Sequence, residues 1–104
     1  MTIRPGLCSI TFRDLAVDDV VALAADAGLA GIEWGADRHV PPGSDAGSVA
    51  GRCADAGLAC PSYGTYLSAG RATVDDVDAA CATAVELGAT NLRIWAPDEA
   101  GAAD

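Results

Sequence analysis

Four side chains in this 104-residue chain have the chemistry to bind a polar small molecule: Glu33, His39, Arg93 and Trp95. A carboxylate accepts hydrogen bonds, a guanidinium donates them, and a tryptophan ring can stack on a sugar ring. Glu33 and Arg93 each lie inside a short apolar run, and Trp95 ends the second of these runs. His39 lies in a loop flanked by glycine and proline. These residue types predict a site for a sugar or another polyol.

Glu33 and Arg93 are expected to lie on the same face of a sheet. Side chains alternate along a strand, and the apolar neighbours of both residues belong beneath helices. The two charged side chains then point to the other face, the inside of a barrel, where an unpaired charge is costly. Both belong to even-numbered strands of the predicted order, and alternate strands contribute to the same interior layer. We therefore expect a Glu33–Arg93 salt bridge, either as the charged floor of a binding site or as a structural ion pair.

The aromatic and histidine candidates each have two interpretations. His39 is the only histidine, and it follows a strand at the face where ligands bind in parallel sheets. It is either a ligand-binding or proton-transferring residue, or a solvated loop histidine. Trp95 and Tyr63 end predicted strands, where they could stack on a sugar or pack in the core. The sequence identifies no catalytic residue and no metal ligand.

A repeated pattern indicates the elements that position these residues. A helix-like segment ends at Gly28, Gly57 or Gly88, and a short apolar run begins within a few residues. Ala25–Ala30 and Ala54–Ala59 share one six-residue sequence, and the glycines are 29 and 31 residues apart. That period is typical of a repeating β/α unit.

The predicted fold class is α/β, a parallel βαβαβαβ arrangement that makes half of a TIM (β/α)8 barrel in one domain over residues 1–104. A complete barrel has eight β/α units in about 250 residues. Strands joined by crossover helices run parallel. We expect strands at Leu7–Phe12, Gly31–Gly35, Leu58–Tyr63 and Asn91–Trp95, and helices at Val17–Ala27, Asp45–Ala56 and between Thr73 and Gly88. Gly64–Ala72 is expected to be a loop and Pro97–Asp104 a frayed tail.

The third helix has the clearest sequence signals. Thr73 and Asp76 have the spacing of a capping box at its start. The apolar residues expected to form its buried stripe are Val74, Val77, Cys81, Ala84 and Val85. The buried stripe of the first helix is predicted to be Val20, Val21, Leu23, Ala24 and Ala27, and that of the second Val49, Cys53 and Ala56.

Charge and cysteine content limit the classes of partner. Fifteen acidic residues against six arginines give a net charge of −9, which argues against nucleic-acid and membrane partners. The chain shows no signal peptide and no apolar stretch of transmembrane length. The four cysteines lack C-x-x-C spacing and are expected to be free thiols, with Cys53 and Cys81 buried. A cytoplasmic location is therefore predicted.

The chain resembles the N-terminal half of the sugar phosphate isomerase/epimerase family, the xylose isomerase-like TIM barrels. The resemblance rests on four segments, taken in order: Gly6–Phe12, Ala27–Trp34, His39–Gly43 and Leu92–Trp95. It implies a parent reaction of metal-assisted aldose–ketose isomerisation or epimerisation. It also implies that a divalent metal such as Mn²⁺ or Mg²⁺ and the acid/base carboxylates belong to strands five to eight. This chain would then supply no cofactor site and no catalytic residue, only substrate-side positions at Glu33, His39, Arg93 and Trp95.

Two functions remain open at this point. The first is a truncated isomerase/epimerase-like protein that is inactive alone. The second is a non-catalytic half-barrel that binds a small polyol or assembles with a partner subunit. The first and fourth predicted strands would be open edges with unpaired backbone groups. We therefore expect either a homodimer or pairing with a complementing C-terminal half.

Overall fold

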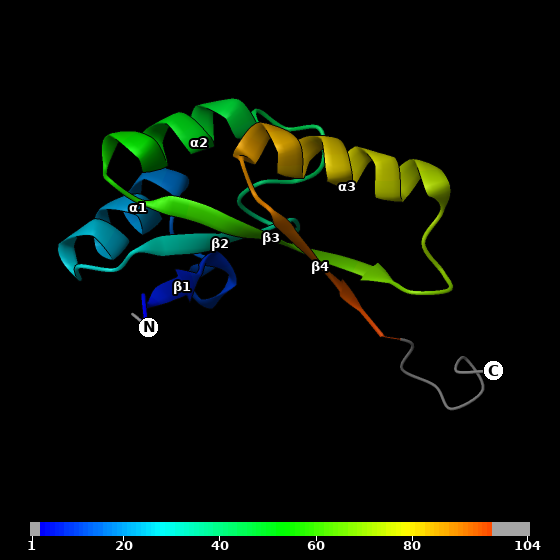
Figure 1. The fold of residues 1–104 in the computed structure, drawn as a ribbon, viewed down its shortest axis with the longest axis horizontal. Helices are drawn as coiled ribbons and strands as arrows, with labels where there is room; N and C mark the ends of the chain where they lie inside the picture. The colour runs from blue at the N-terminus through cyan, green and yellow to red at the C-terminus, as the bar shows by residue number, and fades with distance from the viewer. Residues whose placement is uncertain (1–2, 97–104) are drawn as a thin grey trace.

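The computed structural model describes residues 3–96, which form a four-stranded parallel sheet with helices between its strands (Figure 1). The strand order follows the chain. The predicted α/β class, with four parallel strands and three helices, is confirmed. The strands are β1 (Gly6–Cys8), β2 (Gly31–Gly35), β3 (Ala59–Ser68) and β4 (Asn91–Trp95), and the helices are η1 (Ser9–Phe12, 3-10), α1 (Val17–Asp26), α2 (Ala46–Asp55) and α3 (Val74–Leu87).

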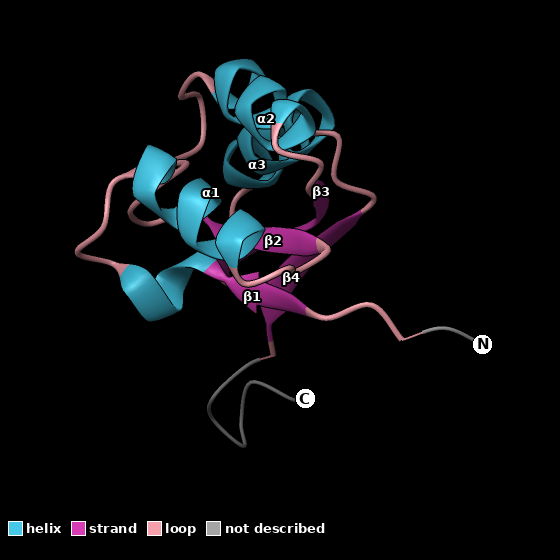
Figure 2. Cartoon of the chain, turned by 90° about the vertical axis from the view of Figure 1, so that its left-hand side faces the viewer, coloured by secondary structure: helices cyan, strands magenta, loops and turns pink. Residues whose placement is uncertain are grey.

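The three α-helices lie over one face of the sheet (Figure 2). Crossovers between parallel strands share one hand, and consecutive crossovers in one direction along a sheet therefore stay on the same side. We call the face beneath the helices the helix face and the opposite one the inner face. No helix of residues 3–96 is both long and apolar enough to cross a membrane.

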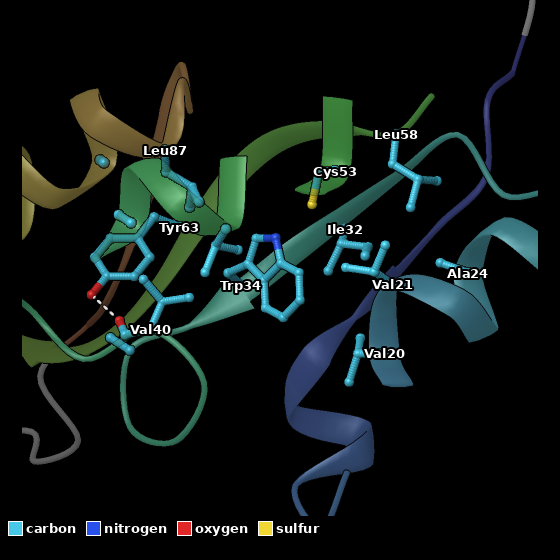
Figure 3. Close-up of a cluster of buried hydrophobic side chains, with 14 of the residues drawn as sticks. Val20, Val21, Ala24, Ile32, Trp34, Val40, Cys53, Leu58, Tyr63 and Leu87 are labelled. Carbon is cyan, nitrogen blue, oxygen red and sulfur yellow. Dashed lines mark hydrogen bonds between the residues drawn. The ribbon is translucent and has the colours of Figure 1, made fainter. Parts of the chain in front are cut away.

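The core lies between the helices and the helix face of the sheet (Figure 3). Ile32, Trp34 and Tyr63 point into it from the strands and are fully buried. The Tyr63 hydroxyl donates to the Val40 carbonyl at 2.5 Å. Tyr63 is therefore a core residue, and the alternative in which its ring stacks on a ligand is wrong. Successive side chains of a strand point to opposite faces of the sheet, and the position of Tyr63 in its strand directs its ring to the helix face and away from the inner face.

Two strands, β1 and β3, begin one residue from the predicted position and end at clearly different residues. β1 ends at Cys8 because the chain turns into η1, where the buried Ser9 hydroxyl accepts a hydrogen bond from the Gly35 amide at 2.8 Å. β3 continues to Ser68, so the loop predicted from Gly64 begins only after that residue. Pairing with β4 extends the strand, since Ser68 is in register with Trp95. The predicted tail 97–104 lies outside the described residues.

Helix α3 starts as predicted but buries a different face. Thr73 and Asp76 form the expected capping box, and Gly88 ends the helix in a left-handed conformation with φ 81°. Val74 and Val85 are 76% and 77% exposed, and Cys81 is also exposed. Ala84 is buried as predicted, and the helix packs against α2 and β3 through Ala80, Thr83 and Leu87 as well.

The shorter helices match their predicted stripes more closely. Val20, Val21 and Ala24 of α1 and Val49 and Cys53 of α2 are buried, as expected. The outer members of each predicted stripe are not: Leu23 is 38% exposed, and Ala27 and Ala56 are exposed. The buried stripes are therefore narrower than the apolar stripes of the sequence.

Candidate functional site

The inner face carries the charged pair that the sequence predicted. Arg93 Nη1 lies 3.2 Å from Glu33 Oε1, and the Ser62 hydroxyl donates to Glu33 Oε2 at 2.9 Å. The Glu33 and Arg93 side chains are 19% and 34% exposed. The expectation of a salt bridge inside the barrel is confirmed. The pair remains partly open to solvent, so both groups are accessible to a small polar ligand.

Gly64 makes room for this ion pair. It lies on β3 between the two charged strands, in register with Arg93. A Cβ atom there would lie 2.7 Å from Arg93 Nη2 and 2.9 Å from Glu33 Oε1. The charged groups therefore lie directly over the glycine backbone. This role of Gly64 was not predicted, although a glycine inside a strand is a known signal of close approach by another group.

Cys8 completes the row of side chains across the inner face. It is in register with Glu33, which is in register with Ser62. Burial raises the pKa of the Cys8 thiol, and the charge and hydrogen bond of Glu33 raise it further, against a smaller lowering by Arg93. The thiol is therefore protonated at neutral pH and can donate to the carboxylate. A cavity of about 330 Å³ lies beside these two residues, toward the amino ends of the strands.

Two aromatic rings stack at the carboxyl ends of β3 and β4. The Tyr66 and Trp95 ring centroids are 6.3 Å apart, with 19° between the ring planes. The Trp95 indole N–H donates to the Thr65 carbonyl at 3.0 Å, and the Arg93 guanidinium lies 5.4 Å from the Trp95 ring centroid. Tyr66 and Trp95 are 42% and 49% exposed. Trp95 therefore adjoins the ion pair and leaves aromatic surface free.

A second charged pair lies at the same end of the sheet, in the loops after η1 and β2. Arg13 Nη2 contacts Asp37 Oδ2 at 2.9 Å and the Tyr66 hydroxyl at 3.0 Å. The Arg38 Nε–H donates to the Arg13 carbonyl at 3.0 Å. Sequence analysis did not identify Arg13 or Asp37. Arg13 follows η1, which continues β1, and Asp37 follows β2. Their positions beyond the carboxyl ends of strands could have identified both as candidates for a ligand site.

His39 is not brought to the inner face. Its Nε2 donates to the Leu15 carbonyl at 2.7 Å, and its ring packs edge-on against Trp34 with centroids 5.8 Å apart. Trp34 points into the core beneath the helices, so His39 lies on the helix face of β2. Its Nδ1 is buried and has no hydrogen-bond partner among residues 3–96. The structure therefore separates His39 from Glu33, Arg93 and Trp95.

The described residues do not fit a divalent metal ion. Within residues 3–96, no three histidine, cysteine, aspartate or glutamate side chains are grouped as ligands. On the inner face, Glu33 is already bonded to Arg93 and Ser62. We therefore derive no chemical step through a metal in this part of the chain.

The arrangement is half of a (β/α)8 barrel with a polar inner face. It is similar to the crystal structure of the probable 3-DHS dehydratase AsbF, involved in petrobactin synthesis, from Bacillus anthracis. The TM-score is 0.76 at 18% sequence identity, over 93% of this chain and 39% of that one. A similarity at this identity shows a shared fold. The sequence matches no protein-family model and no curated protein.

Proposed function

We propose that this chain is the N-terminal, substrate-side half of a xylose isomerase-like barrel, spanning residues 1–104, and that its inner face binds a sugar or polyol. The observation that carries the proposal is the partly exposed Glu33–Arg93 pair beside the partly exposed ring of Trp95. Ligands of parallel α/β folds bind at the carboxyl ends of the strands, where Trp95 lies. The barrel fold shared with a probable dehydratase supports a small-molecule site.

The residues divide the work of binding a polyhydroxylated molecule. The Glu33 carboxylate would accept hydrogen bonds from ligand hydroxyls, and the Arg93 guanidinium would donate to them. The Trp95 ring offers an apolar surface for the C–H groups of a sugar. Because Arg93 and Glu33 hold each other in place, these groups are positioned before the ligand arrives, which lowers the entropy cost of binding.

The parent reaction we propose is aldose–ketose isomerisation or epimerisation of a sugar or its phosphate. Moving a proton beside a carbonyl needs an acid and a base poised near neutral pH. We propose that this chain supplies neither these groups nor the ligands of a divalent metal. On this proposal the chain binds substrate and does not convert it alone. The four free cysteines support our proposal of a reducing, cytoplasmic compartment.

Ligand titration tests the binding proposal. We expect calorimetry with ketoses, polyols and sugar phosphates to give saturable binding for at least one of them. Glu33→Gln and Trp95→Ala should each weaken that binding at least tenfold. The matched control Glu86→Gln, at an exposed position of α3, should leave it unchanged. Absence of saturable binding, or equal binding by all three variants, would overturn the proposal.

Two further measurements separate the roles of the remaining residues. His39→Gln should leave binding unchanged, because His39 lies on the helix face; a tenfold loss would return it to the site. An assay with Mn²⁺ or Mg²⁺ should show no interconversion of ketoses by the chain alone. Clear turnover would show that it contains a complete catalytic site.

A further inference from the structure

The helices lie over one face of the sheet, and the inner face has no helix of residues 17–87 over it (Figure 2). β1 and β4 are the edges of the sheet, so each presents unpaired backbone donors and acceptors. At the β4 edge, Trp95 is 49% exposed. The cavity of about 330 Å³ lies on the inner face next to β1, with Gly6, Gly31 and Pro61 among its lining residues. Side chains of a second sheet would fill such a space.

The Glu33–Arg93 contact is staggered along the strands in the way that the interior layers of a closed barrel are. Glu33 is in register with Ser62, and Ser62 with Asn91. Arg93, the ionic partner of Glu33, lies two residues beyond Asn91. The layer that contains both charges thus rises by about one residue per strand, and eight strands then give the shear of 8 that a TIM barrel requires. Two four-stranded halves with this stagger can close together.

We infer that a second copy of this chain covers the inner face, with β4 of each copy meeting β1 of the other in an eight-stranded barrel of two-fold symmetry. Each interior layer of such a barrel takes four side chains from alternate strands. The layer that holds Glu33 and Arg93 would then contain both residues from each copy. Their order around the ring would be Glu, Arg, Glu, Arg, so every charge would have opposite charges on both sides.

Charge complementarity favours a second copy as the occupant. Within residues 3–96, the Arg93 guanidinium contacts Glu33 through Nη1, and its Nε–H has no acceptor. Arg93 thus keeps a hydrogen-bond donor that has no acceptor among residues 3–96. Glu33 of the second copy would lie two strands beyond Arg93, the same separation as within one chain. The ring is neutral, so the net charge of −9 per chain remains outside the interface layer.

This inference uses the same Glu33–Arg93 pair as the proposed binding site, but the oligomeric state is measured without any ligand, so the two proposals can fail separately. Wild-type protein should sediment at twice the chain mass of 10.4 kDa at micromolar concentration. A folded monomer with a cooperative melt, or assembly only when a different half-barrel is added, would overturn it. This measurement needs no variant and decides the oligomeric state alone.

A charge-reversal pair tests the ring itself. Glu33→Arg places four arginines in the layer of a homodimer, and Arg93→Glu places four glutamates there, so each variant alone should dissociate at least tenfold more readily. Mixing the two variants opposes arginines of one chain to glutamates of the other. Only contacts between chains are restored, because each chain keeps its own like-charged pair. A heterodimer in the mixture is the expected result. Homodimers of either variant as tight as wild type, or no heterodimer between variants with native circular dichroism, would refute the ring.

Discussion

Replacing Glu33 with glutamine tests whether the inner-face ion pair stabilises the fold. At 3.2 Å the two charges attract by about 5 kcal/mol at an effective dielectric constant of 20, before desolvation is counted. Breaking a fully buried pair costs about 3–5 kcal/mol, whereas an exposed pair is worth about 0.2–1 kcal/mol. Glu33 is 19% and Arg93 34% exposed, so this pair lies between those limits. We expect a loss of about 2 kcal/mol.

Glutamine is the informative substitution because it keeps the size of the side chain. Its amide oxygen can still accept from Arg93 and its amide nitrogen can donate to the Ser62 hydroxyl, so the substitution mainly removes the negative charge that faces Arg93. For a domain of this length, 2 kcal/mol lowers the melting temperature by about 8–15 °C. Thermal melts followed by circular dichroism at one protein concentration measure this, since the melting temperature of a dimer depends on concentration.

A double-mutant cycle isolates the contribution of the pair. With Arg93→Gln as the second substitution, the coupling energy between the two sites should be about 1–2 kcal/mol. Glu86→Gln, exposed on α3, is the matched control and should melt with the wild type. A Glu33→Gln variant that melts within about 2 °C of that control would refute the reasoning, because the ion pair would then make no measurable contribution to the free energy of unfolding.

Three other perturbations follow from single contacts. Gly64→Ala places a methyl group 2.7 Å from Arg93 Nη2, so it should separate Arg93 from Glu33 and cost about 1–2 kcal/mol in denaturant unfolding. Thr73→Ala removes the capping box of α3 and should lower the melting temperature by about 4–8 °C, the equivalent of about 1 kcal/mol. Burial raises the pKa of Tyr63 to about 12, above the ordinary value of 10.0. The contribution of the protonated Tyr63 hydroxyl to the free energy of unfolding is fully present below pH 10 and is lost as the pH rises through 12. Denaturant unfolding at a series of pH values should show a loss of about 2–3 kcal/mol over that range, and the loss should be smaller in Tyr63→Phe.

Two matched variants control for these substitutions. Gly51→Ala lies in α2 with no atom within 4 Å of the added methyl group, so it should stabilise the chain by about 1 kcal/mol through helix propensity. Equal effects of Gly64→Ala and Gly51→Ala would contradict the role assigned to Gly64. Thr90→Ala, at an exposed position before β4, should change the melting temperature by less than half as much as Thr73→Ala.

Local chemistry alone allowed much of the fold to be predicted. The glycine spacing located the β/α units, and β2 and β4 have the predicted bounds. The capping box at Thr73 was readable because its hydrogen bonds join residues only three apart. The Glu33–Arg93 pair was also predictable, since strand alternation and an even-numbered strand order are properties of sequence once the units are located.

Other features depended on contacts between residues distant in the chain. The end of β1 depends on Ser9 meeting Gly35, and the length of β3 depends on β4 continuing beside it. Only part of the buried face of α3 could be inferred from hydrophobicity, because the helix buries Ala80 and Thr83 and leaves Val74 and Val85 exposed. In each case the deciding partner lies more than twenty residues away or on another element.

The same distinction applies to the candidate site. Sequence determined which residue types this chain brings to the ends of its strands, and it placed Glu33, Arg93 and Trp95 correctly on one face. Alternation along β3 directs Tyr63 to the core, whereas only the tertiary structure separated His39 from the others, because a loop side chain has no alternation to fix its direction. Only the structure showed that Arg13 and Asp37 meet and that Gly64 underlies the ion pair. The alternation of side chains along a strand fixes which face each side chain points to, and it can be read from sequence. Contacts between side chains on different strands and loops form only in the folded chain.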